Sequence, residues 1–81
     1  MIDMLNYRWK IEMILNSGAH LTGYVIMPQS NSQDVADTLW DGKSNNSIIG
    51  FNNEDATAAI YVRVGEIASM SISYVDCEKA R

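Results

Sequence analysis

A phenol and a guanidinium two residues apart are the side chains best suited to binding chemistry. Tyr61 and Arg63 alternate with apolar neighbours in residues 58–64, so in a β-strand both would project from one polar face. An aromatic ring beside a guanidinium can bind a flat anionic ligand by stacking and by paired hydrogen bonds. The same pair is also typical of a solvated sheet surface. The sequence predicts Tyr61 and Arg63 as ligand-binding residues, with a surface role as the alternative.

The residue types most used in catalysis and metal binding do not cluster in the sequence. The chain has one histidine, His20, in an expected turn, and one cysteine, Cys77, in an expected tail. A general base needs an orienting partner, and a zinc site needs three or four ligands. The spacings of phosphate loops, dinucleotide sites, nucleophile elbows and zinc sites are absent from the sequence. We expect a protein that is not an enzyme and that uses no metal and no cofactor.

The most regular charge pattern is an acidic stripe formed by Asp34, Asp37 and Asp41. Such a stripe could be a weak cation site, or a face that imitates phosphates to a basic partner. It is also the outer face expected of an amphipathic helix, which we favour because the spacing of a calcium loop is absent.

Length and charge limit the class of protein. Eighty-one residues make a single domain, residues 1–81, with a small core that self-association would supplement. The net charge of −4 argues against nucleic-acid binding, which depends on basic residues that neutralise phosphates. One cysteine favours a reducing compartment, and no apolar run approaches the ~18 residues of a membrane span. We expect a cytoplasmic protein without a membrane partner.

Hydrophobic periodicity predicts a β-hairpin followed by a short helix. Apolar and polar residues alternate over residues 7–15 and 21–27, and residues 16–19 contain the Asn and Gly of a tight turn. Residues 30–42 suit a helix that packs an apolar stripe of Val35, Leu39 and Trp40 on the sheet. Ser30, Asn31 and Ser32 could each cap the start of the helix, and Ser30 with Gln33 has the spacing of a capping box. Gly42 suits the residue after the helix.

Alternation predicts further strands over residues 47–51, 58–64 and 67–75, with a break at Gly65. Residues 1–6 are expected to be a lead-in, and residues 76–81 a frayed, charged tail. The element order β-β-α-β-β-β predicts a β-rich α+β fold. We expect a small, mostly antiparallel sheet or a partly open barrel, with one short amphipathic helix packed on it.

Residues 10–25, K-I-E-M-I-L-N-S-G-A-H-L-T-G-Y-V, resemble the first motif of Sm-like small β-barrels, and residues 62–72 are similar to the second. The resemblance implies subunit rings formed by strand pairing. It also implies RNA binding through an Asp and an Asn after the second strand and a later Arg-Gly. The chain departs from this pattern, because Pro28 and the expected helix replace the Asp and Asn, and Val64 separates Arg63 from Gly65.

The small size, the acidity and the segment V-x-V-G-E-I-A-x-M-x-I resemble the short β-rich accessory proteins of phages and prophages of Gram-positive bacteria. This resemblance implies a non-catalytic protein that inhibits a host protein or sequesters a small ligand. We therefore expect a homo-oligomeric binding module that acts through protein–protein contact. The alternative is an Sm-like oligomer that binds a nucleotide or RNA through Tyr61 and Arg63.

Overall fold

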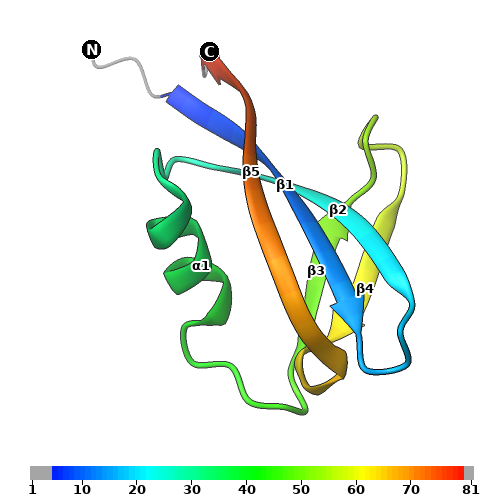
Figure 1. Ribbon diagram of the computed structural model, residues 1–81. Coiled ribbons are helices and arrows are strands. Elements are labelled where there is room, and N and C mark those ends of the chain that lie inside the picture. The colour runs from blue at the N-terminus through cyan, green and yellow to red at the C-terminus, as the bar shows by residue number, and fades with distance from the viewer. Residues whose placement is uncertain (1–4, 80–81) are drawn as a thin grey trace.

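Five antiparallel strands and one helix make up the computed structural model, which describes residues 5–79. The strands are β1 (Leu5–Leu15), β2 (His20–Met27), β3 (Ile48–Asn52), β4 (Ala59–Arg63) and β5 (Ile67–Lys79), with helix α1 (Ser32–Trp40) and a 3-10 turn η1 (Val64–Glu66). They form one sheet in the order β4-β3-β2-β1-β5 (Figure 1). The expected β-rich, antiparallel α+β fold is confirmed, and the sheet is open, with β4 and β5 at its edges.

Strand β1 is the centre of the sheet, because it pairs along most of its length with β2 on one side and β5 on the other. Its alternation places Trp9, Ile11 and Met13 on the inner face, where all three are buried. The hairpin predicted over residues 7–27 is confirmed. His20, however, is the first residue of β2 rather than part of the turn, since it pairs with Ile14.

The pairing between β2 and β3 is short. These strands share one register pair, Tyr24 with Asn52, and then diverge. Beside this pair, a Cβ atom at Gly23 would lie 2.5 Å from the Cβ of Phe51. Only glycine allows such a close approach of the two strands. Gly23 therefore lets the β3–β4 hairpin fold over and bury Phe51.

Helix α1 closes the inner side of the sheet. The predicted capping box of Ser30 and Gln33 is wrong, since Asn31 is the N-cap. Its side-chain oxygen accepts from the Asp34 N–H at 2.9 Å, and its amide donates to the Asp34 carboxylate. The helix ends at Trp40, and Gly42, with a φ of +68°, follows the C-cap residue Asp41 as predicted.

The apolar stripe of the helix packs as expected at two of its three positions. Val35 and Leu39 are buried in the core with the strands, but Trp40 is only partly buried and borders a cleft beside β5.

The long edge strand β5 contains two bulges, at which one extra residue interrupts its pairing with β1. Val75 is the extra residue of one bulge and Ala68 is the extra residue of the other, since neither pairs with a residue of β1. The predicted tail is wrong for residues 76–79, because these residues continue β5 and pair with the start of β1. The predicted lead-in is wrong for Leu5 and Asn6, which belong to β1; residues 1–4 and 80–81 lie outside the described residues.

We expect Gly23→Ala to lower the free energy of unfolding by about 1–3 kcal/mol, because the new methyl group would overlap Phe51 close to its backbone. The matched control is Gly50→Ala on β3, where the new Cβ meets only the ring of Tyr61, at 2.9 Å. That ring is exposed and can swing away. Urea melts check both variants, and a Gly23→Ala protein as stable as Gly50→Ala would contradict the close approach.

Shortening a side chain in the apolar stripe of α1 should show how much the packing of the helix on the sheet contributes to stability. Leu39→Ala should cost about 2–4 kcal/mol through lost burial and a cavity. Asp37→Ala, on the exposed face of the same helix, should cost less than about 0.5 kcal/mol. Equal and small losses at both positions in chemical denaturation would mean that α1 is not packed on the sheet.

Candidate functional site

The two residues proposed from the sequence lie together on the outer face of edge strand β4. Tyr61 is 72% exposed, and its ring lies over Gly50 of the neighbouring strand β3. Arg63 is exposed opposite Ile48 and makes no hydrogen bond or ion pair with the described side chains. The shared face predicted for the pair is therefore present. The adjoining hollow, however, extends from Tyr61 toward β2 and does not include Arg63.

This tyrosine hollow opens where β2 and β3 diverge. It has a volume of about 390 Å³ and is lined by Tyr24, Val25, Ile26, Met27, Gly50, Phe51, Asn52, Ala59 and Tyr61. Tyr24, Ile26 and Asn52 also border a smaller hollow of about 210 Å³ beneath the loop of residues 53–56. The sequence did not indicate either hollow, because they depend on the short pairing between β2 and β3.

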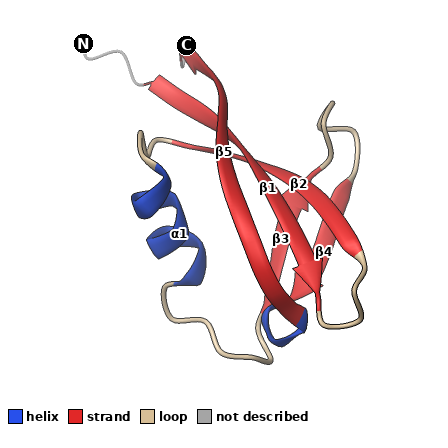
Figure 2. Cartoon of the chain, in the orientation of Figure 1, coloured by secondary structure: helices blue, strands red, loops and turns tan. Residues whose placement is uncertain are grey.

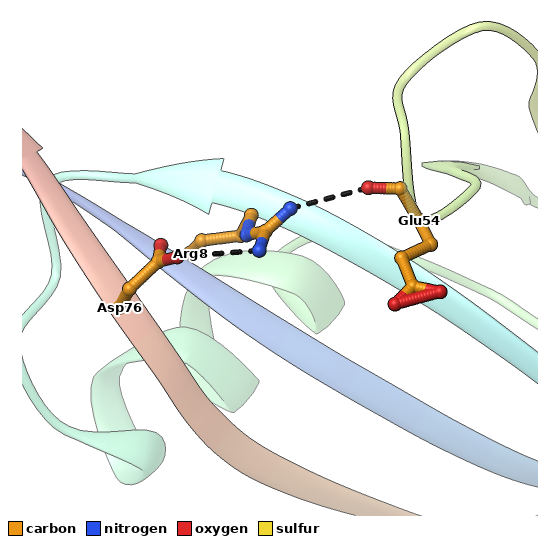
Figure 3. A network of polar contacts seen from close by, with 3 residues as sticks. All are labelled: Arg8, Glu54 and Asp76. Atoms are coloured by element: carbon orange, nitrogen blue, oxygen red, sulfur yellow. Dashed lines mark hydrogen bonds and ion pairs between the residues drawn. The ribbon is translucent and has the colours of Figure 1, made fainter.

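Arg8 on β1 links the loop at Glu54 with strand β5 at Asp76 on the outer face of the sheet (Figure 3). Its Nη1 donates to the Glu54 carbonyl oxygen at 3.1 Å, and its Nη2 donates to the Asp76 carboxylate at 3.2 Å. The guanidinium lies 5.7 Å from the centre of the Tyr24 ring. Sequence reasoning missed Arg8, because its partners are 46 and 68 residues away and no local pattern reports them.

A second surface lies between α1 and β5, which run side by side (Figure 2). A cleft of about 930 Å³ is bounded by residues of the helix, the following loop and the start of β5: Ala36, Asp37, Trp40, Asp41, Gly42, Lys43, Ser44, Asn45, Val64, Ile67, Ala68, Ser69 and Met70. Trp40 contributes its partly buried ring, and Asp37 and Asp41 of the acidic stripe lie at the rim. The third member, Asp34, instead bonds to the cap residue Asn31.

The edge of β5 beside this cleft carries no partner strand in the described sheet. Between its two bulges, residues 69–74 form a regular stretch without a charged residue. None of the side chains described on β5, at residues 67–77, is buried. Tyr74, packed edge-on against Trp9, remains 54% exposed. Partial desolvation raises the pKa of Tyr74, and a hydrogen bond with Cys77 acts in the same direction.

His20 and Cys77 lie far apart. His20 pairs with Ile14, and Cys77 pairs with Tyr7, seven residues away along β1. At about 3.3 Å per residue this separation is roughly 23 Å, so the two residues form no catalytic pair within one chain. Within residues 5–79, no three His, Cys, Asp or Glu side chains gather as a metal site would require. No helix in that part of the chain is long and apolar enough to span a membrane.

The geometry thus defines a small antiparallel β-sheet protein with two adjoining hollows on its outer face and with the edge of β5 open beside a cleft. No protein-family model matches the chain, and neither a search of curated proteins nor a search of solved structures found a match.

The loop beside the smaller hollow provides a test by pH. The Thr57 hydroxyl donates to the Asp55 carboxylate at 2.6 Å and lowers the pKa of that carboxyl below 3.8, with the Thr57 backbone N–H contributing. Because the folded-state pKa is the lower one, Asp55 stabilises the fold above pH 3.8, and this contribution disappears as the pH falls through the folded pKa. Carboxyl NMR titration should show the lowered value, and Thr57→Val should raise it. A value of 3.8 or higher in the unchanged chain would contradict the contact.

Proposed function

We propose that the chain is a small, non-enzymatic binding module that acts through protein–protein contact at the open edge of β5. The observation that supports this proposal is that the middle of β5 lacks the features that usually prevent an edge strand from pairing. Strands at sheet edges are usually protected from further pairing by charged residues, prolines or bulges. Residues 69–74 contain no charged residue and no proline, and the two bulges lie outside them. This edge is therefore suited to accept another strand.

The side chains of β5 that point to the inner face leave apolar surface exposed along the same edge. Met70 and Ile72 are only partly buried, and Tyr74 is more than half exposed. A strand added along β5 would extend the sheet past these residues and cover them, as the strands on both sides of β1 cover its inner side chains. The gain would be large relative to the small core of an 81-residue chain.

A second copy of the chain is the partner that this edge fits best. In an antiparallel pair of β5 strands, directly opposite residues lie on the same face. A two-fold axis at Ser71 would set Ser69 against Ser73 on the outer face and Met70 against Ile72 on the inner face. No like charges would oppose each other within residues 69–73. The proposed homo-oligomer therefore requires no change in the strand.

The phage-type resemblance suggests a related use of the same edge. A module of this kind could inhibit a host protein by adding β5 to an exposed strand of that protein, which would compete with self-association. A cytoplasmic location is consistent with this proposal, since Cys77 is a free and exposed thiol.

Sedimentation of the chain should test the proposal. Over about 1–100 μM we expect a species of twice the 9.0 kDa chain mass, which dissociates on dilution. Ser71→Lys should shift the protein to monomer by placing a charge on the edge. The matched control is Thr22→Lys, because Thr22 and Ser71 both pair with Glu12, on its opposite sides, and only Ser71 is on an edge strand.

Two results would contradict the use of this edge. The first is a monomer of the unchanged chain at every concentration. The second is a dimer that Ser71→Lys and Thr22→Lys weaken to the same extent.

A further inference from the structure

The tyrosine hollow has the parts of a small-molecule site, and it lies on the outer face, apart from the edge of β5. One wall is the ring of Tyr61. A Cβ atom at Gly50 would lie 2.9 Å from the ring atom Cε1, so one side of the ring is in contact with the bare backbone of β3. With 72% of the residue exposed, the other side of the ring is open. An aromatic ring supported on one face and free on the other can stack with a planar ligand.

The opposite wall is Tyr24 on β2, and its position is fixed. The guanidinium of Arg8 lies 5.7 Å from the centre of the ring. Arg8 is in turn held by Asp76 on β5 and by the carbonyl oxygen of Glu54 (Figure 3). The two tyrosines therefore stand on strands at either side of β3, with Gly50 and Asn52 between them. A volume of about 390 Å³ is within the range of ligand pockets in proteins.

The floor of the hollow offers hydrogen-bonding groups. The register between β2 and β3 stops at Tyr24 and Asn52, so the backbone of both strands runs on past the hollow without a continuing ladder. The side chain of Asn52 is exposed and makes no hydrogen bond with the described residues. An amide can donate and accept at the same time, as can an unpaired strand edge. These groups suit a ligand whose edge carries both donors and acceptors.

The charges around the hollow select against an anion. The positive charge of Arg8 is paired with Asp76, and Asp55 adds a carboxylate to the adjoining hollow. The guanidinium of Arg63, which bonds to no side chain within residues 5–79, is on the same face but does not line the hollow. We infer that the tyrosine hollow binds a neutral planar heteroaromatic ring of the nucleobase class, stacked on Tyr61 and hydrogen-bonded by Asn52 and the adjacent strand backbones.

NMR titration of the nitrogen-15-labelled chain with adenosine tests this inference. We expect amide shifts at Ile26, Gly50 and Asn52, with a dissociation constant on the order of 1 mM or below. Tyr61→Ala should weaken binding at least about fivefold, whereas Tyr61→Phe, which keeps the ring, should change it less than about twofold. Ile14→Ala is the control, since Ile14 is exposed on the outer face of β1 and does not line the hollow.

A second titration, with adenosine monophosphate, tests the charge of the ligand. A neutral-ring site should bind both compounds within about twofold of each other. Binding of the phosphate form more than about tenfold tighter, and lost in Arg63→Ala, would overturn the inference in favour of an anionic ligand held by Tyr61 and Arg63. The inference also fails if adenosine causes no shifts up to about 10 mM, or shifts confined to the cleft beside α1.

Discussion

The contact between Phe51 and the backbone of Gly23 is the constraint on which the rest of the structure depends. It joins a three-stranded layer, made of β5, β1 and β2, to a separate hairpin of β3 and β4. With a single register pair between β2 and β3, packing rather than hydrogen bonding holds the two parts together. The core side chains Phe51 and Val62 reach Trp9, Ile11 and Met13 only because the hairpin can fold over at this glycine.

The same contact keeps the tyrosine hollow apart from the open edge of β5. The hairpin turns away from β2 to form the hollow at Tyr24 and Tyr61, and the sheet stays open, so that β5 keeps a free edge on the other side of β1. Helix α1 covers the inner face through Val35 and Leu39 but leaves the apolar side of β5 uncovered at Tyr74. The hollow and the edge of β5 lie on opposite sides of the central strand β1, so a ligand in the hollow would not obstruct a strand added at the edge.

Local patterns in the sequence were sufficient to predict the strands, the helix and the antiparallel class. The alternation over residues 7–15 and the position of Gly42 correspond directly to β1 and to the end of α1. The shared face of Tyr61 and Arg63 also follows from alternation alone. Contacts between distant residues could not be predicted in this way. Arg8, Glu54 and Asp76 come together only through the strand order. The sequence could not single out Asn31 as the helix cap, because Ser30, Asn31 and Ser32 could each serve.

The bulge at Val75 affects how the chain tolerates changes in length. The extra residue interrupts the alternation, so that Tyr74 faces inward and Asp76 faces outward, toward Arg8. Loss of Val75 would leave both side chains on their present faces and turn the strand into a regular one. Loss of Ile72 instead would move one flanking segment of β5 to the wrong face. Loss of Ala68 at the other bulge would have the same effect as loss of Val75, so relatives of this chain whose β5 is one residue shorter are expected to lack one of these two residues.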